Sequence, residues 1–219
     1  MGLGPHLANG TRRNIFEFTR QVVERMRPPP LVEGLEHIPP EEPFVLVANH
    51  YQRKGLWILH TAAALTQAVA QVRGPADPPV RWMVTANWPP WRLGPFTMAS
   101  PGDLLLPRVA AALQCYPVSF SGANPAYTAA TLRRLLREAR ASATPIGIFP
   151  EGVAGSAGKL AEPLPGVERV LTHLRRPVLP CGVSEDGRFV LRFGPPVAAS
   201  ALRGPDAAAV ALAAVARLL

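Results

Sequence analysis

Two motifs place a base and an acid after apolar runs that are typical of buried strands. Residues 45–48 lead into Asn49-His50, and about 100 residues later residues 146–149 lead into Pro150-Glu151-Gly152. Imidazole can take up a proton near neutral pH, and a carboxylate can orient a group or bind one. A base at one strand end and an acid at another therefore indicate a site of acid–base chemistry.

The elements that must position these residues alternate along the chain. Apolar runs predict strands at 31–32, 44–48, 80–85, 115–118, 146–149, 178–183 and 189–193, and helical periodicity predicts helices at 56–72, 104–113, 125–141, 166–174 and 205–219. This order predicts a single α/β domain, residues 31–219, with a mostly parallel central sheet flanked by helices. Sites in such sheets form at the C-terminal ends of the strands, where His50 and Glu151 are expected.

An amphipathic N-terminal helix is expected before this domain, within residues 1–30. Ile15, Phe18, Val22 and Met26 follow one another at helical spacing in the segment 11–27, and several arginines can lie along its margins. The apolar stripe can pack on the core, or it can lie in a lipid interface with the arginines on anionic headgroups. Both hold if the helix bridges core and membrane.

Composition limits the partners. The 219 residues are 48% hydrophobic, which suits one sizeable core, and the net charge of +8 favours anionic partners such as membrane surfaces or acyl-thioester nucleotides. The arginines are dispersed and no nucleic-acid motif is present, so we expect no nucleic-acid partner. Cys115 and Cys181 lack the spacing of metal ligands, so no metal site is expected.

The predicted location is cytoplasmic, peripheral to the inner face of the cell membrane. The N-terminus does not resemble a secretory signal, and unpaired cysteines in apolar contexts suit a reducing compartment. The longest apolar stretch, residues 56–72, contains His60, Gln67 and Gln71, so it predicts a buried helix and not a membrane span.

Five short motifs in a fixed order carry a resemblance to a known family. They are Val32-Glu33-Gly34-Leu35, Pro39-Pro40, Asn49-His50, Phe149-Pro150-Glu151-Gly152 and Arg176-Pro177-Val178-Leu179-Pro180. Together they resemble the glycerolipid acyltransferases, typified by the 1-acylglycerol-3-phosphate acyltransferases, from about residue 31 to residue 193. The resemblance implies that His50 is the general base, which takes a proton from an acceptor hydroxyl as it attacks an acyl thioester. It also implies that Glu151 and its neighbours bind the acceptor.

Three departures from the family pattern stand out. The family's first motif is Asn-His-x-x-x-x-Asp, and Gly55 occupies the position of the Asp that orients the histidine. Phe120 and Ala154 stand where the family places arginines that bind phosphate. Arg53 and Lys54 lie inside the first motif and can replace part of the missing positive charge, or they can belong to a solvated loop.

The sequence therefore predicts an O-acyltransferase that moves a fatty acyl group from acyl-CoA or an acyl-carrier-protein thioester to a lipid hydroxyl, without a cofactor. The predicted catalytic residue is His50. The predicted substrate-binding residues are Asn49, Arg53, Lys54, Phe149, Pro150, Glu151 and Gly152. The main alternative is a catalytically silent acyl- or lipid-binding protein on the same fold, and thioester hydrolysis is a lesser one. Trp82, Trp88 and Trp91, with Phe96 and Met98, are expected either to border an acyl groove or to pack in the core.

Overall fold

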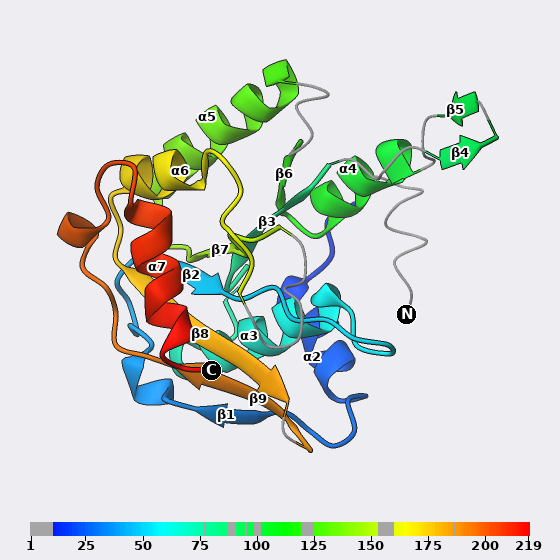
Figure 1. Cartoon of the computed structure of the whole chain (residues 1–219). Helices are drawn as coiled ribbons and strands as arrows, with labels where there is room; N and C mark the ends of the chain where they lie inside the picture. The colour runs from blue at the N-terminus through cyan, green and yellow to red at the C-terminus, as the bar shows by residue number, and fades with distance from the viewer. Residues whose placement is uncertain are drawn as a thin grey trace.

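A seven-stranded sheet forms the centre of the molecule (Figure 1). The computed structural model describes residues 11–76, 78–86, 91–94, 96–98, 102–119, 125–152, 160–185 and 187–219. The strands of the sheet are β1 (Leu31–Glu33), β9 (Phe189–Phe193), β8 (Val178–Glu185), β2 (Val45–Ala48), β7 (Ile146–Ile148), β3 (Arg81–Thr85) and β6 (Tyr116–Val118), in this spatial order. From β8 to β6 all neighbours pair in parallel, whereas β9 pairs antiparallel with β8 and parallel with β1. The predicted α/β fold with a mostly parallel sheet is thus confirmed.

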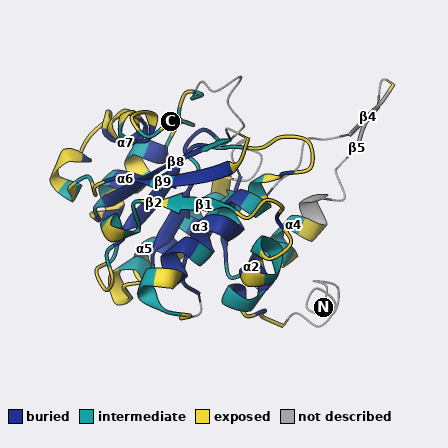
Figure 2. Cartoon of the chain, turned by 90° about the horizontal axis from the view of Figure 1, so that it is seen from below, coloured by how far each residue is buried: buried dark blue, intermediate teal, exposed yellow. Residues whose placement is uncertain are grey.

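Helices cover both faces of the sheet, as Figure 2 shows from a second side. One apolar cluster joins the sheet to α3 (Ile58–Arg73), α4 (Gly102–Ala112) and the segment after α2 (Ile15–Val23). A second cluster joins it to α5 (Pro125–Ala141), α6 (Val167–Leu174) and α7 (Ala207–Ala216). Two short 3-10 helices, η1 (Leu35–His37) and η2 (Ala199–Ala201), complete the main body.

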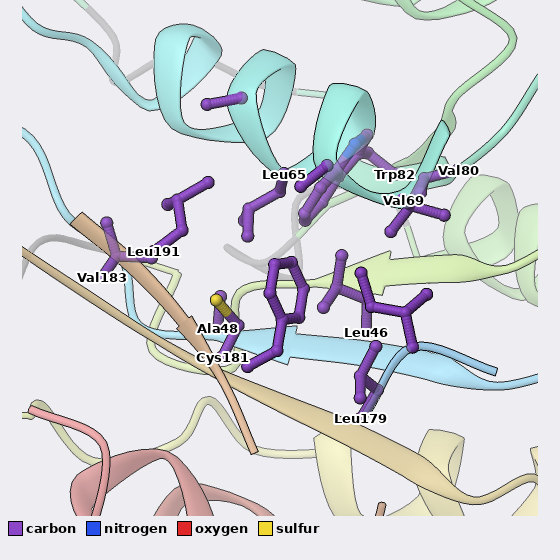
Figure 3. Packing of buried hydrophobic residues seen from close by; sticks show 14 of the residues in the cluster. Leu46, Ala48, Leu65, Val69, Val80, Trp82, Leu179, Cys181, Val183 and Leu191 are labelled. Atoms are coloured by element: carbon purple, nitrogen blue, oxygen red, sulfur yellow. The ribbon is translucent and has the colours of Figure 1, made fainter. Parts of the chain in front are cut away.

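Strand β2 is buried along its whole length because both of its faces are covered. Val45 and Val47 belong to the cluster under α5, α6 and α7, whereas Leu46 and Ala48 belong to the cluster under α3. Figure 3 shows Leu46 and Ala48 among Leu65, Trp82 and Leu191 on the α3 side. The alternation of a pleated strand therefore explains why residues 45–48 are continuously apolar.

The N-terminal stripe packs on the core, as one of the two readings expected. Helix α2 is shorter than the predicted segment, because the Asn14 side chain accepts a hydrogen bond from the Glu17 N–H and caps the helix there. Ile15 and Phe18 are buried, and the Gln67 side chain of α3 donates to the backbone oxygen of Phe16. These contacts attach α2 to the main body. The predicted boundary between the N-terminal helix and the α/β domain at residue 30 stays a prediction.

The structure places some of the aromatic residues that were expected to border an acyl groove or to pack in the core. Trp82 is buried and packs in the core, whereas Trp88 lies outside the described residues. Trp91, Phe96 and Met98 belong to the two-stranded hairpin of β4 (Trp91–Leu93) and β5 (Phe96–Met98). Within the described ranges, no helix is long and apolar enough to cross a membrane.

Candidate active site

His50 and Glu151 meet at the edge of the sheet because β2 and β7 are parallel neighbours, with Val47 paired to Ile148. The backbone N–H of His50 donates to Glu151 Oε1 at 2.8 Å. The other carboxylate oxygen, Oε2, accepts from the backbone N–H of Ala161 at 2.5 Å. Glu151 is only 1% exposed, so both of its oxygens are occupied in a buried place. A contact between Glu151 and an acceptor stays a prediction.

Asn49 fixes the end of β2 to β8. Its side-chain nitrogen donates to the Val183 carbonyl at 2.9 Å, and its side-chain oxygen accepts from the Val183 N–H at 2.7 Å. The side chain is buried, so these two bonds are shielded from water and hold the backbone firmly. Asn49 and Glu151 together position His50 from both neighbouring strands.

An aromatic wall borders the His50 ring. Its imidazole meets Phe149 edge to face, with ring centroids 5.7 Å apart and planes at 70°. Phe149 in turn stacks on Trp82, with centroids 4.7 Å apart and planes at 9°. Trp82 can lie there because residue 147 is glycine, since a Cβ at Gly147 would come within 2.4 Å of Trp82 Cε3.

Burial gives His50 the protonation state of a base but leaves it without an orienting partner. Because the ring is partly withdrawn from water, the pKa of His50 is lower than the usual 6.5, so the ring is neutral at neutral pH. Nδ1 is buried and has no hydrogen-bond partner in the part of the chain that is described. General-base attack through Nε2 requires the tautomer with its proton on Nδ1, so this nitrogen needs an acceptor during catalysis.

The loop geometry suits a glycine at position 55, where the family pattern has Asp. Arg53 and Leu56 exchange two backbone hydrogen bonds of 2.9 Å, which closes a tight turn with Lys54 and Gly55 at its tip. Gly55 has φ +81°, which suits the third residue of a type II turn and favours glycine. A Cβ placed at Gly55 would lie 4.0 Å from Arg53 Nη1 and would meet nothing nearer.

Arg53 is engaged within the protein. Its guanidinium pairs with the carboxylate of Glu185, which also accepts a hydrogen bond of 2.8 Å from Tyr51 Oη. The hydrogen bonds from Arg53 hold the pKa of Glu185 below its usual value. The predicted role of Arg53 in binding a phosphate would require this pair to open, whereas no carboxylate in the described ranges pairs with Lys54.

The turn that carries Glu151 packs against the chain that follows it. The Gly152 N–H donates to the Phe149 oxygen at 3.1 Å, and the Pro150 oxygen accepts from the Leu164 N–H at 2.9 Å. Gly152 has φ +65°, and a Cβ there would come within 2.1 Å of Leu164 Cδ1. The roles predicted for Pro150 and Gly152 in substrate binding stay predictions. Phe120 and Ala154 lie outside the described residues.

Arg176, from the last of the motifs, has a structural role that the sequence did not indicate. It is buried, and its guanidinium donates to backbone oxygens of Ala139, Ser142 and Thr144 at the end of α5. Burial lowers the pKa of this guanidinium from its usual value. Arg176 therefore satisfies carbonyls that the helix end leaves free.

Comparisons with known proteins agree with this geometry. The family model described as Acyltransferase matches residues 30–184, which is most of the chain, and the protein belongs to that family. The solved structure of PlsC, the 1-acyl-sn-glycerophosphate (LPA) acyltransferase from Thermotoga maritima, is similar in fold, with a TM-score of 0.62. The similarity covers 93% of this chain and 76% of that chain, at 18% sequence identity. No curated protein matches the sequence.

Proposed function

We propose that the protein transfers a fatty acyl group from a coenzyme A or acyl-carrier-protein thioester to the hydroxyl of a lipid, with His50 as general base. The observation that carries the proposal is the neutral imidazole held at the end of β2, where Asn49 and Glu151 fix the backbone on either side. Membership of the acyltransferase family supports the same reaction class.

In the proposed reaction, His50 Nε2 takes the proton from the acceptor hydroxyl while the oxygen attacks the thioester carbonyl. The tetrahedral intermediate then collapses, its carbon–sulfur bond breaks, and the thiolate leaves with the proton from the imidazolium. The products are an ester and a free thiol. The reaction is expected to be slow, because loss of the orienting carboxylate costs about 10⁴-fold in the serine-protease triad.

The second function that we consider is a silent acyl- or lipid-binding protein. The specific observation in its favour is the buried Nδ1 of His50, which has no partner among the described residues. Glu151 and Glu185 do not replace the missing Asp, since Glu151 accepts from backbone N–H groups and Glu185 accepts from Tyr51 and Arg53. A protein that only binds lipids does not need a polarised imidazole.

One set of assays separates the two functions. The purified protein is incubated with an acyl thioester and a lysolipid, and both the released thiol and the acylated product are quantified. His50→Ala is expected to lower transfer by about 10²–10⁴-fold. His173→Ala, which removes an exposed histidine on α6, serves as the matched control and should retain full activity.

The outcomes distinguish the functions clearly. Equal turnover by the parent and His50→Ala would remove His50 from the mechanism. Saturable binding of the lysolipid by a parent with no detectable product would assign the protein to the binding class. Thiol release without an acylated lipid would indicate hydrolysis of the thioester.

A further inference from the structure

A cavity lies beside the candidate active site, on the same edge of the sheet. Its volume is about 380 Å³, and it lies between the end of α2, the turn 53–56, the first turn of α3, the end of β8 and the start of β9. Its apolar lining includes Met26, Leu56 and Phe189. Figure 1 shows the loop before α3 protruding next to α2 at this edge.

Large apolar side chains are exposed next to this cavity. Trp57 is 65% exposed and Leu59 is 40% exposed, and they lie in sequence between Leu56 and His60, which both line the cavity. The backbone N–H of Trp57 donates to His60 Nδ1 at 3.1 Å, so the start of α3 is fixed and presents these side chains from a rigid element. The apolar surface of Trp57 stays in contact with water after folding, so burying it against another surface would be favourable.

Positive charge surrounds the same place. Arg25 and Arg27 line the cavity and are exposed, and Lys54 lies at the tip of the adjoining turn. No carboxylate in the described ranges pairs with any of these three: Glu24 pairs with Arg20, and Glu185 pairs with Arg53. The Arg27 guanidinium donates to the backbone oxygens of Glu24 and Met26, which leaves its charge without a counter-ion. The edge therefore carries an uncompensated charge close to two exposed apolar side chains.

These properties point to a membrane and not to a protein partner. A stable protein interface buries about 1,200–2,000 Å², far more than two side chains can supply. Binding to a membrane needs less buried area than a protein interface does. Tryptophan enters the headgroup region, and attraction to anionic lipids contributes about 1 kcal/mol of binding free energy for each nearby cation. Charge complementarity thus favours anionic phospholipid as the occupant.

We propose that this edge, defined by Arg25, Arg27, Lys54, Trp57 and Leu59, docks the protein on membranes that contain anionic phospholipid. Trp57 and Leu59 enter the headgroup region, and the cations contact lipid phosphates, with one headgroup in the cavity beside Arg25 and Arg27. The surface lies next to the loop that follows His50, where the proposed reaction would meet its lipid. Its physiological purpose rests on the proposed function, but the docking itself does not require turnover.

Vesicle sedimentation and fluorescence test the surface without any catalytic assay. The parent should bind vesicles of phosphatidylglycerol and phosphatidylcholine more tightly than vesicles of phosphatidylcholine alone, and added salt should weaken the binding. Arg25→Ala with Lys54→Ala should lower the partition coefficient about 10- to 30-fold. Trp57→Ser with Leu59→Ser should lower it about tenfold or more.

Matched controls come from the opposite part of the molecule. Arg203→Ala with Arg217→Ala removes two exposed charges near α7, and Val210→Ser removes an exposed apolar side chain on α7. Both controls should bind like the parent. Lipids brominated near the headgroup should quench the parent's tryptophan fluorescence, and Trp57→Phe should remove most of that quenching while it retains binding.

Four results would overturn the proposal, of which the first three come from the vesicle experiments. They are a parent that does not bind anionic vesicles, edge variants that bind as tightly as the controls, and quenching that persists in Trp57→Phe. Binding of soluble glycerol phosphate without binding of vesicles would assign the cavity to a free phosphate compound and would also overturn it. None of these results bears on whether His50 is catalytic, so failure of this proposal and failure of the proposed function remain distinguishable.

Discussion

The carboxylate of Glu151 accepts the backbone N–H of His50 at 2.8 Å, so the acid of one motif positions the base of the other through the main chain. Its second oxygen accepts from Ala161, which joins β2 to the segment after the 149–152 turn. In Glu151→Gln, the NH₂ of the side-chain amide must face one of these two half-buried N–H groups. Each charge-assisted bond contributes about 1.5–3 kcal/mol, so one unpaired donor costs a comparable amount.

We therefore expect Glu151→Gln to lower the free energy of unfolding by about 2 kcal/mol and to slow acyl transfer. Urea unfolding and the transfer assay measure the two effects. Glu162→Gln, at an exposed position on the same segment, is the matched control. Unchanged stability with a raised KM alone would instead favour a direct role of Glu151 in acceptor binding.

The pH dependence of His50 provides a second prediction. Burial lowers its pKa below 6.5, and none of the carboxylates that the structure describes raises it again. Because the pKa in the folded state is lowered, the imidazole is neutral above pH 6.5 and becomes protonated only at lower pH. We expect kcat/KM to be level at neutral pH, with its acid limb below 6.5.

Nuclear magnetic resonance titration of the His50 ring measures the same pKa independently of turnover. The lowered pKa of His50 also affects stability. The native state binds a proton at His50 less readily than the unfolded chain does, so the free energy of unfolding decreases as the pH falls below 6.5. A midpoint above 6.5 would mean that a carboxylate reaches Nδ1 in solution.

Restoring the family's Asp at position 55 tests the meaning of its absence. A Cβ at Gly55 would lie nearest to Arg53 Nη1, and φ +81° is unfavourable for most other residues. We expect that Gly55→Asp pairs with Arg53 and does not accelerate acyl transfer. A higher rate, with an acid limb moved to higher pH, would show that the turn rearranges and that the carboxylate orients His50.

Gly147 links the stability of the sheet to the active site. In Gly147→Ala the new Cβ would come within 2.4 Å of the Trp82 ring. That ring stacks on Phe149, and Phe149 contacts the His50 ring. Overpacking of this kind costs about 1–3 kcal/mol. A double-mutant cycle with Trp82→Leu, followed by urea unfolding, should give a cost for Gly147→Ala that is smaller beside Leu than beside Trp. Additive costs would show that the two side chains do not compete for space.

The strand ends could be predicted from the sequence because local patterns determine them. The apolar runs before Asn49-His50 and Pro150-Glu151 predicted two strands of a mostly parallel sheet, and the structure pairs these strands and so brings His50 and Glu151 together. The hydrogen bonds between the Asn49 side chain and the Val183 backbone were not foreseen, because they join residues 134 positions apart that no sequence periodicity relates. The Arg53–Glu185 pair was missed for the same reason, since the antiparallel pairing of β8 with β9 decides where Glu185 lies.

The last prediction concerns the acceptor. Phe120 and Ala154 occupy the positions where the family pattern has arginines, and bringing an unpaired phosphate dianion into a partly dry site is costly. Of the cations that could compensate, Arg53 is paired with Glu185 and Arg81 with Glu138. We therefore expect lysophosphatidic acid to be a poorer substrate than a hydroxyl acceptor without a phosphate monoester, such as a glycolipid or a partly acylated neutral lipid.

Side-by-side assays of these acceptors with one acyl thioester measure the preference as a ratio of kcat/KM values. Arg53→Ala and Lys54→Ala are included, because either cation would become essential if it had taken over the phosphate. Under the prediction, Arg53→Ala leaves the low rate with lysophosphatidic acid unchanged, since its guanidinium already serves Glu185. Efficient acylation of lysophosphatidic acid that either substitution abolishes would contradict the prediction. It would show that the phosphate site has moved from the usual arginine positions to the turn beside His50.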